Sequence, residues 1–124
     1  MIAVVRLVLI GVAGAAGALC RLGIANLVAA RTLPVATLVV NVGGAFALGL
    51  VLAWVSPRLG PATASVVSVG FLGAFTTFST FAMETVALHQ SGRAGAAAGY
   101  VAVSIGLGLA AAVAGQHLGR SLLP

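Results

Sequence analysis

The fold depends most on residues 70–84, which read GFLGAFTTFSTFAME. Two glycines and four hydroxyl-bearing residues fall within the first eleven positions of this stretch. Glycine lowers helix stability, and Ser and Thr side chains offer the backbone alternative hydrogen bonds. We therefore predict that this segment is a helix that breaks at about residues 73–77, in the middle of an apolar run.

Four apolar segments cover the chain, and the interrupted one is the third. A helix needs about 20 apolar residues to cross the hydrocarbon core of a bilayer. The segments that meet this length are residues 2–29, 35–55, 61–88 and 94–118, and Pro, Gly and Arg punctuate the turns between them. We predict one all-α integral membrane domain over residues 1–124, with four transmembrane helices.

The composition excludes several classes of protein. Hydrophobic residues make up 61% of the chain and charged residues 6%, whereas soluble domains are about 25% charged. Glu84 is the single acidic residue, so neither a Ser-His-Asp set nor a pair of catalytic carboxylates exists. The six arginines are scattered singly, which argues against a nucleic-acid partner. We predict a membrane protein that is not an enzyme.

The distribution of arginines bears on orientation in the membrane. If the segments alternate in direction, one side carries three arginines and the other two or three: Arg6, Arg58 and Arg120 against Arg31 and Arg93, with Arg21 near the latter. Orientation follows an excess of Lys and Arg on one side, and almost none exists here. Both orientations should insert, which permits an antiparallel dimer, although a single arginine or a lipid effect is an alternative determinant. Abundant glycine, including the GxxxG of Gly95 and Gly99, favours an oligomer.

Ionisable and strongly polar residues inside membrane spans are candidates for function. Arg21 either reaches to the interface or lines an aqueous vestibule, and Asn41 either joins two helices or donates to an anion. Glu84 is either an interfacial carboxylate, a partner for an arginine or a group that carries protons. Tyr100 and Ser104 lie one turn apart on one face. Their hydroxyls either hydrogen-bond to their own helix backbone or a neighbour, or form a hydroxyl-lined track with the third segment.

The third segment also carries four phenylalanines at helical spacing. Phe71, Phe75, Phe78 and Phe81 are either core packing or rings whose electropositive edges face a narrow pore. Backbone carbonyls freed at the predicted break are candidate cation ligands, as in the broken helices of transporters. Trp54, near the end of the second segment, is typical of an interfacial anchor.

Three motifs resemble those of one known family. They are GALCR at residues 17–21, TLVVNVGGAF at residues 37–46, and the long third-segment motif from Gly70 through Phe81 to Glu84. Over nearly its whole length the chain resembles the Fluc (CrcB-type) fluoride channels, and the third motif is the most specific part of the match.

The resemblance implies a fluoride-selective passive channel in the inner (plasma) membrane that exports cytoplasmic fluoride and so lowers its toxicity. It implies an antiparallel dual-topology dimer, formed from two identical chains or with a homologous subunit. It further implies two fluoride pores per dimer and a structural sodium ion at the dimer interface.

The resemblance also assigns residues. Backbone carbonyls of Gly73 and Thr76 would hold the sodium ion, and Arg21 would lie in the vestibule. The implied pore residues are Asn41, Phe78, Phe81, Thr80, Tyr100 and Ser104. Gly108 stands where the family often has another hydroxyl, one turn beyond Ser104, so the sequence leaves the continuation of the polar track open.

Two alternatives stay open. A small proton-coupled multidrug exporter would have a similar length and number of spans, but it needs a carboxylate in the first helix, and residues 2–29 contain no acid. A non-transporting assembly subunit would explain the small residues but not the costly Arg21 and Asn41.

Overall fold

The computed structural model describes residues 2–28 and 33–123, which contain helices and no strand. The all-helical prediction is therefore confirmed. The elements are α1 (Ile2–Leu27), α2 (Val35–Leu50), the π-helical segment η1 (Val51–Val55), α3 (Ser56–Ser65), the π-helical segment η2 (Val66–Leu72), α4 (Gly73–Phe75), α5 (Phe78–Gln90) and α6 (Ala94–Ser121).

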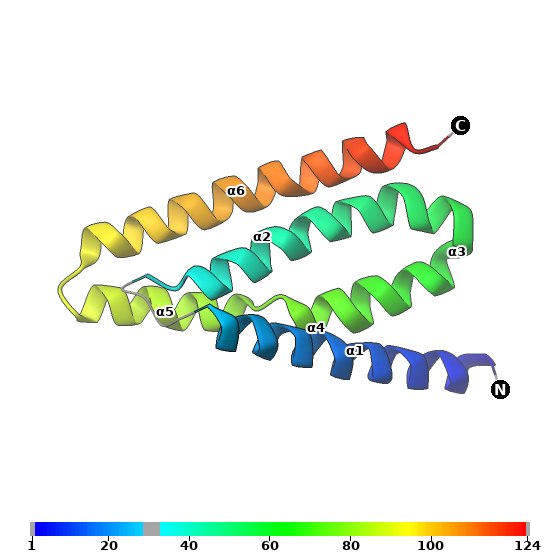
Figure 1. Cartoon of the computed structure of the whole chain (residues 1–124), viewed down its shortest axis with the longest axis horizontal. Helices are drawn as coiled ribbons and strands as arrows, with labels where there is room; N and C mark the ends of the chain where they lie inside the picture. The colour runs from blue at the N-terminus through cyan, green and yellow to red at the C-terminus, as the bar shows by residue number, and fades with distance from the viewer. Residues whose placement is uncertain (1, 29–32, 124) are drawn as a thin grey trace.

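These elements combine into long rods that lie side by side (Figure 1). α2 continues into η1 without leaving helical geometry, since Val51 has φ −60° and ψ −45°. This rod packs along α6 on one side, and α1 packs against η2 and α4. Both ends of the described chain and α3 lie at one end of the molecule, while the turn between α5 and α6 lies at the other.

The second and third rods are joined by a sharp reversal at Gly60. Its φ of +82° lies in the left-handed region, which glycine adopts without a steric penalty. Pro61 follows directly, and its missing N–H makes it suitable for starting the next helical stretch. The turn that the sequence predicts around residues 56–61 therefore reverses the chain at this one glycine.

Three helical stretches of the described chain are long and apolar enough to cross a membrane. They are Ala3–Leu27, Val35–Gln90 and Ala94–Ser121. The middle stretch has 56 residues and folds back at Gly60. Large apolar side chains cover the outside of the single chain, and Leu19 and Leu109, for example, are 67% and 66% exposed. An apolar exterior of this kind suits lipid as the surrounding solvent.

Close contact between α2 and α6 depends on glycines in both helices. A Cβ at Gly49 would overlap the carbonyl oxygen of Ala112, and a Cβ at Gly115 would overlap that of Phe46. The GxxxG of Gly95 and Gly99 behaves differently, because a Cβ at either position meets nothing within 4 Å. Small residues thus bring the helices together as predicted, but at positions other than the literal motif.

Arg6 and Arg58, which the sequence assigns to the same side, both contact residues at the end of the molecule that holds α3 and the chain termini. Arg6 lies near the start of α1 and donates to the hydroxyl of Ser65 at 2.7 and 3.1 Å. Arg58 donates to the carbonyl of Leu122 at 2.8 Å and lies over the Trp54 ring at 5.4 Å. These contacts join the chain ends to the Gly60 reversal. Arg31 lies outside the described residues.

We expect Gly115→Ala to destabilise the fold, because the added methyl group would force α2 and α6 apart. Overpacking of this kind costs about 1–3 kcal/mol. The matched control is Gly106→Ala in the same helix, where a Cβ meets nothing within 4 Å and the higher helix propensity of alanine should be neutral or stabilising. Thermal unfolding of both variants in detergent measures the difference, and equal melting temperatures would contradict this account of the α2–α6 contact.

Candidate functional site

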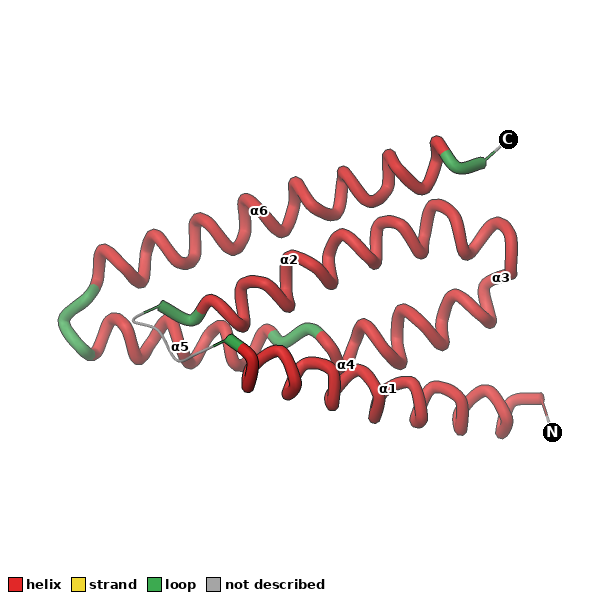
Figure 2. The backbone as a smooth tube through the Cα atoms, in the orientation of Figure 1, coloured by secondary structure: helices red, strands yellow, loops and turns green. Residues whose placement is uncertain are grey.

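The predicted break in the third segment is present and falls at two threonines. α4 ends at Phe75, Thr76 and Thr77 are extended (ψ 159° and 108°), and α5 begins at Phe78. Figure 2 shows this interruption as a short loop inside an otherwise helical rod. The prediction of a break within residues 73–77 is confirmed.

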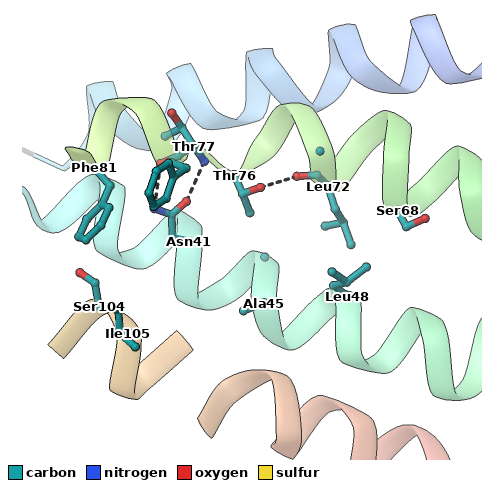
Figure 3. Close-up of a pocket in the computed structure, with 13 residues that line it drawn as sticks. Asn41, Ala45, Leu48, Ser68, Leu72, Thr76, Thr77, Phe81, Ser104 and Ile105 are labelled. Atoms are coloured by element: carbon teal, nitrogen blue, oxygen red, sulfur yellow. Dashed lines mark hydrogen bonds between the residues drawn. The ribbon is translucent and has the colours of Figure 1, made fainter. Parts of the chain in front are cut away.

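Asn41 of α2 pairs with the backbone of Thr77 through two hydrogen bonds. The Thr77 N–H donates to Asn41 Oδ1 at 2.8 Å, and Asn41 Nδ2 donates to the Thr77 carbonyl at 3.1 Å (Figure 3). The backbone N–H fixes the orientation of the amide, since only the oxygen of the side chain accepts. Asn41 therefore joins two helices, and its second amide proton has no acceptor among the described residues.

Thr77 also caps α5. Its hydroxyl oxygen accepts from the Thr80 N–H at 3.3 Å, and its hydroxyl proton goes to Thr80 Oγ1 at 2.8 Å. In an unbroken helix, the N–H groups of Thr77 and Thr80 would donate to the carbonyls four residues back, at Gly73 and Thr76. Because both N–H groups are engaged elsewhere, the Gly73 and Thr76 carbonyls lose their helical donors.

A groove of about 420 Å³ runs beside the break, between α2, α6 and the broken rod. Its lining includes Asn41, Thr76, Thr77, Phe81, Ser68 and Ser104 (Figure 3). The Ser104 hydroxyl is buried and has no hydrogen-bond partner in the described part of the chain. An unpartnered buried hydroxyl is costly, so this group is a candidate for contact with a ligand or water.

The break divides the four phenylalanines into two pairs. Phe71 and Phe75 stack at 5.7 Å and pack against the buried cluster of Val51, Ala64 and Leu72. On the other side of the break, Phe78 and Phe81 lie 5.8 Å apart, and both line the groove. The first pair is therefore core packing, and only the second pair lies at the candidate site.

Tyr100 does not join Ser104 at the groove. It is 7% exposed, its ring packs on Phe81 at 5.2 Å, and its hydroxyl donates to Glu84 Oε2 at 2.8 Å. Thr37 donates to the other carboxylate oxygen, Oε1, at 2.8 Å. Glu84 thus ties α2 to α6 through two hydroxyls. Thr37 was not a candidate from the sequence, although it lies one turn before Asn41.

Arg21 and Thr80 lie at a second cavity, of about 460 Å³, together with Thr37, Thr77 and Glu84. Thr77 lines both this cavity and the groove, so the break separates the two spaces. Arg21 and Glu84 both line this cavity, but within the described residues they form no ion pair. The vestibule role of Arg21 stays a prediction.

Comparison with known proteins gives one consistent family. Residues 8–116 match the family described as CrcB-like protein, Camphor Resistance (CrcB). A relative from Deinococcus radiodurans is 49% identical over 88% of this chain and 90% of its own length. Relatives from Paracoccus denitrificans and Nitratidesulfovibrio vulgaris are 41% and 42% identical, over 91% and 93% of this chain and 93% and 97% of their own lengths. Each of the three is named as the fluoride-specific ion channel FluC.

We expect Asn41→Leu to destabilise the break, because it leaves the buried N–H and carbonyl of Thr77 without partners. A buried unsatisfied polar group costs about 1–3 kcal/mol. The Thr77 amide should exchange with solvent at least about tenfold faster, as measured by NMR hydrogen exchange in detergent micelles. The control is Asn26→Leu, which makes the same change at an exposed position in α1. Unchanged protection of the Thr77 amide in Asn41→Leu would rule out the pairing.

Proposed function

The chain belongs to the CrcB-like protein family, and from this membership together with the groove we propose that it is a fluoride-selective passive ion channel. The observation that carries the proposal is that the buried Ser104 hydroxyl and one amide proton of Asn41 lie at the same groove, both without a partner among residues 2–28 and 33–123. The relatives named above are ion channels, which confirms that the chain is not an enzyme and favours a channel over a drug exporter.

The groove supplies what a small, strongly hydrated anion requires. A pore must replace the water around the ion with donors, and conduction needs several weak sites in place of one tight site. Asn41 and Ser104 donate, and the ring edges of Phe78 and Phe81 carry partial positive charge. Fluoride enters cells from acidic surroundings as hydrogen fluoride and ionises in the cytoplasm, so a passive path suffices for its export.

The second cavity acts as a vestibule in this proposal. The Arg21 guanidinium raises the local concentration of anions, and the hydroxyl of Thr80 lies in the same space. Thr77 lines both cavities, so an ion that leaves the vestibule meets the groove at the helix break. Tyr100 has an indirect role here, because it packs on Phe81 and holds Glu84 instead of donating directly to the ion.

The chain crosses the plasma membrane four times in this proposal. α1 and α6 each supply one crossing, and the stretch Val35–Gln90 supplies two because it reverses at Gly60. An even number of crossings places both chain ends on the same side, in agreement with their shared end of the molecule (Figure 1).

A second, antiparallel subunit closes the groove. The single chain leaves the groove open to its surroundings, and Phe78 beside it is 79% exposed. The near balance of arginines between the two sides supports insertion in both orientations. An identical chain or a homologous subunit fills this place, and the assembled dimer has two pores.

The proposal includes a structural sodium ion between the two subunits. Carbonyl oxygens are suitable ligands for such a hard cation, and the carbonyls of Gly73 and Thr76 have lost their helical donors. Described residues include no cluster of three or more His, Cys, Asp or Glu side chains, so a side-chain metal site is not the basis of this proposal. When bound, the ion would neutralise the partial negative charge of these carbonyls.

Fluoride efflux from liposomes that contain only this purified protein tests the proposal, with chloride measured in parallel. We expect fast fluoride efflux without chloride efflux, read with a fluoride electrode. Ser104→Ala removes the buried donor and should slow fluoride efflux about tenfold. Ser121→Ala, outside both cavities at the end of α6, is the control and should conduct like the unmodified protein.

Two outcomes would count against parts of the proposal. Efflux that requires a pH gradient would favour the proton-coupled exporter. No efflux from the protein alone would exclude a homomeric channel, and adding a homologous subunit to the same liposomes would then test a heteromeric one.

A further inference from the structure

The hydroxyls that line the groove differ in whether their protons are available. The Thr76 proton goes to the Leu72 carbonyl at 2.9 Å, and the Thr77 proton goes to Thr80 Oγ1 at 2.8 Å. Neither threonine hydroxyl can therefore donate to an ion without first giving up its present hydrogen bond. Donors with a spare proton are Asn41, Ser104 and one residue outside the predicted set, Ser68.

Ser68 lies in η2, at the opposite end of the groove from Ser104 (Figure 3). It is half-buried, and its hydroxyl forms no hydrogen bond with any other described residue. By contrast, the hydroxyls of Thr76, Thr85 and Ser91 each donate to a backbone carbonyl three or four residues back. Ser68 also lies in a π-helical segment, a geometry that occurs frequently at functional sites.

The surroundings of Ser68 are otherwise apolar. Ala45, Leu48 and Leu72 line this end of the groove. Of the described residues at this end, only Ser68 offers a dehydrated anion a side-chain donor, and an unsolvated ion in an apolar space is strongly disfavoured. On the facing helix α6, Gly108 lies one turn beyond Ser104 and offers no hydroxyl.

We propose that the Ser68 hydroxyl is a further anion-binding group, which extends the fluoride path past the helix break to the end of the groove near Leu48. The inference rests on the proposed function. It places a hydrogen-bond donor on the third rod, whereas α6 has a glycine one turn beyond Ser104. The anion passes from Ser104 and Asn41, on one side of the break, to Ser68 on the other.

The test is fluoride efflux from liposomes containing Ser68→Ala. We expect it to slow about tenfold, with the melting temperature unchanged, because the lost hydroxyl has no partner within the described chain. Ser68→Thr keeps the hydroxyl and should retain most of the flux. Ser56→Ala is the matched control, since Ser56 is also half-buried and lines neither cavity.

The outcomes separate this inference from the proposed function. If the unmodified protein conducts fluoride and Ser68→Ala conducts equally well, the inference is wrong and the channel proposal stands. A loss of flux in Ser68→Ala that Ser68→Thr does not restore, or that comes with a lower melting temperature, would also overturn it in favour of a packing role. If the unmodified protein conducts no fluoride either alone or with a homologous subunit, the proposed function fails, and the inference that rests on it fails with it.

Discussion

The pairing of Asn41 with the backbone of Thr77 is the interaction on which the rest of the site depends. Each unsatisfied backbone group in hydrocarbon costs several kcal/mol, so a helix can break there only if its freed groups find partners. Asn41 satisfies both the N–H and the carbonyl of Thr77, and the Thr77 hydroxyl satisfies the Thr80 N–H. The proposed function depends on the groups that this arrangement leaves: two carbonyls without helical donors, and one amide proton with no partner among the described residues.

The packing of the helices makes that pairing possible. Gly49 and Gly115 allow α2 and α6 to approach until their backbones touch. Gly44, which follows Asn41 by about one turn of α2, leaves the space that the Thr76 methyl group occupies. α2 is thereby held against both α6 and the broken rod. Its polar residues, Thr37 and Asn41, then reach Glu84 and Thr77 respectively.

Sequence reasoning predicted the helical class and the break because both follow from local composition. Glycines and hydroxyls inside an apolar run weaken a helix wherever they occur, and the break indeed lies at Thr76 and Thr77. The partners of these residues are not local. Thr37 and Glu84 are 47 residues apart, and Asn41 and Thr77 are 36 apart, so periodicity carries no information about their pairing. For the same reason the sequence did not show that Tyr100 and Ser104, which share a helical face, have different surroundings. Tyr100 donates to Glu84 of α5, whereas Ser104 lines the groove. The position of Ser68 beside the groove also depends on tertiary packing.

The central claim is that fluoride contacts the spare amide proton of Asn41 beside the helix break. The most direct measurement is solid-state NMR of the dipolar coupling between ¹⁹F and ¹⁵N, in bilayers that contain fluoride and protein labelled with ¹⁵N-asparagine. The chain has two asparagines, Asn26 and Asn41, so the two side-chain signals can be assigned with a single Asn26→Gln variant. The account predicts ¹⁹F coupling at Asn41 Nδ2 and none at Asn26. Bound fluoride that couples to neither side chain would contradict it.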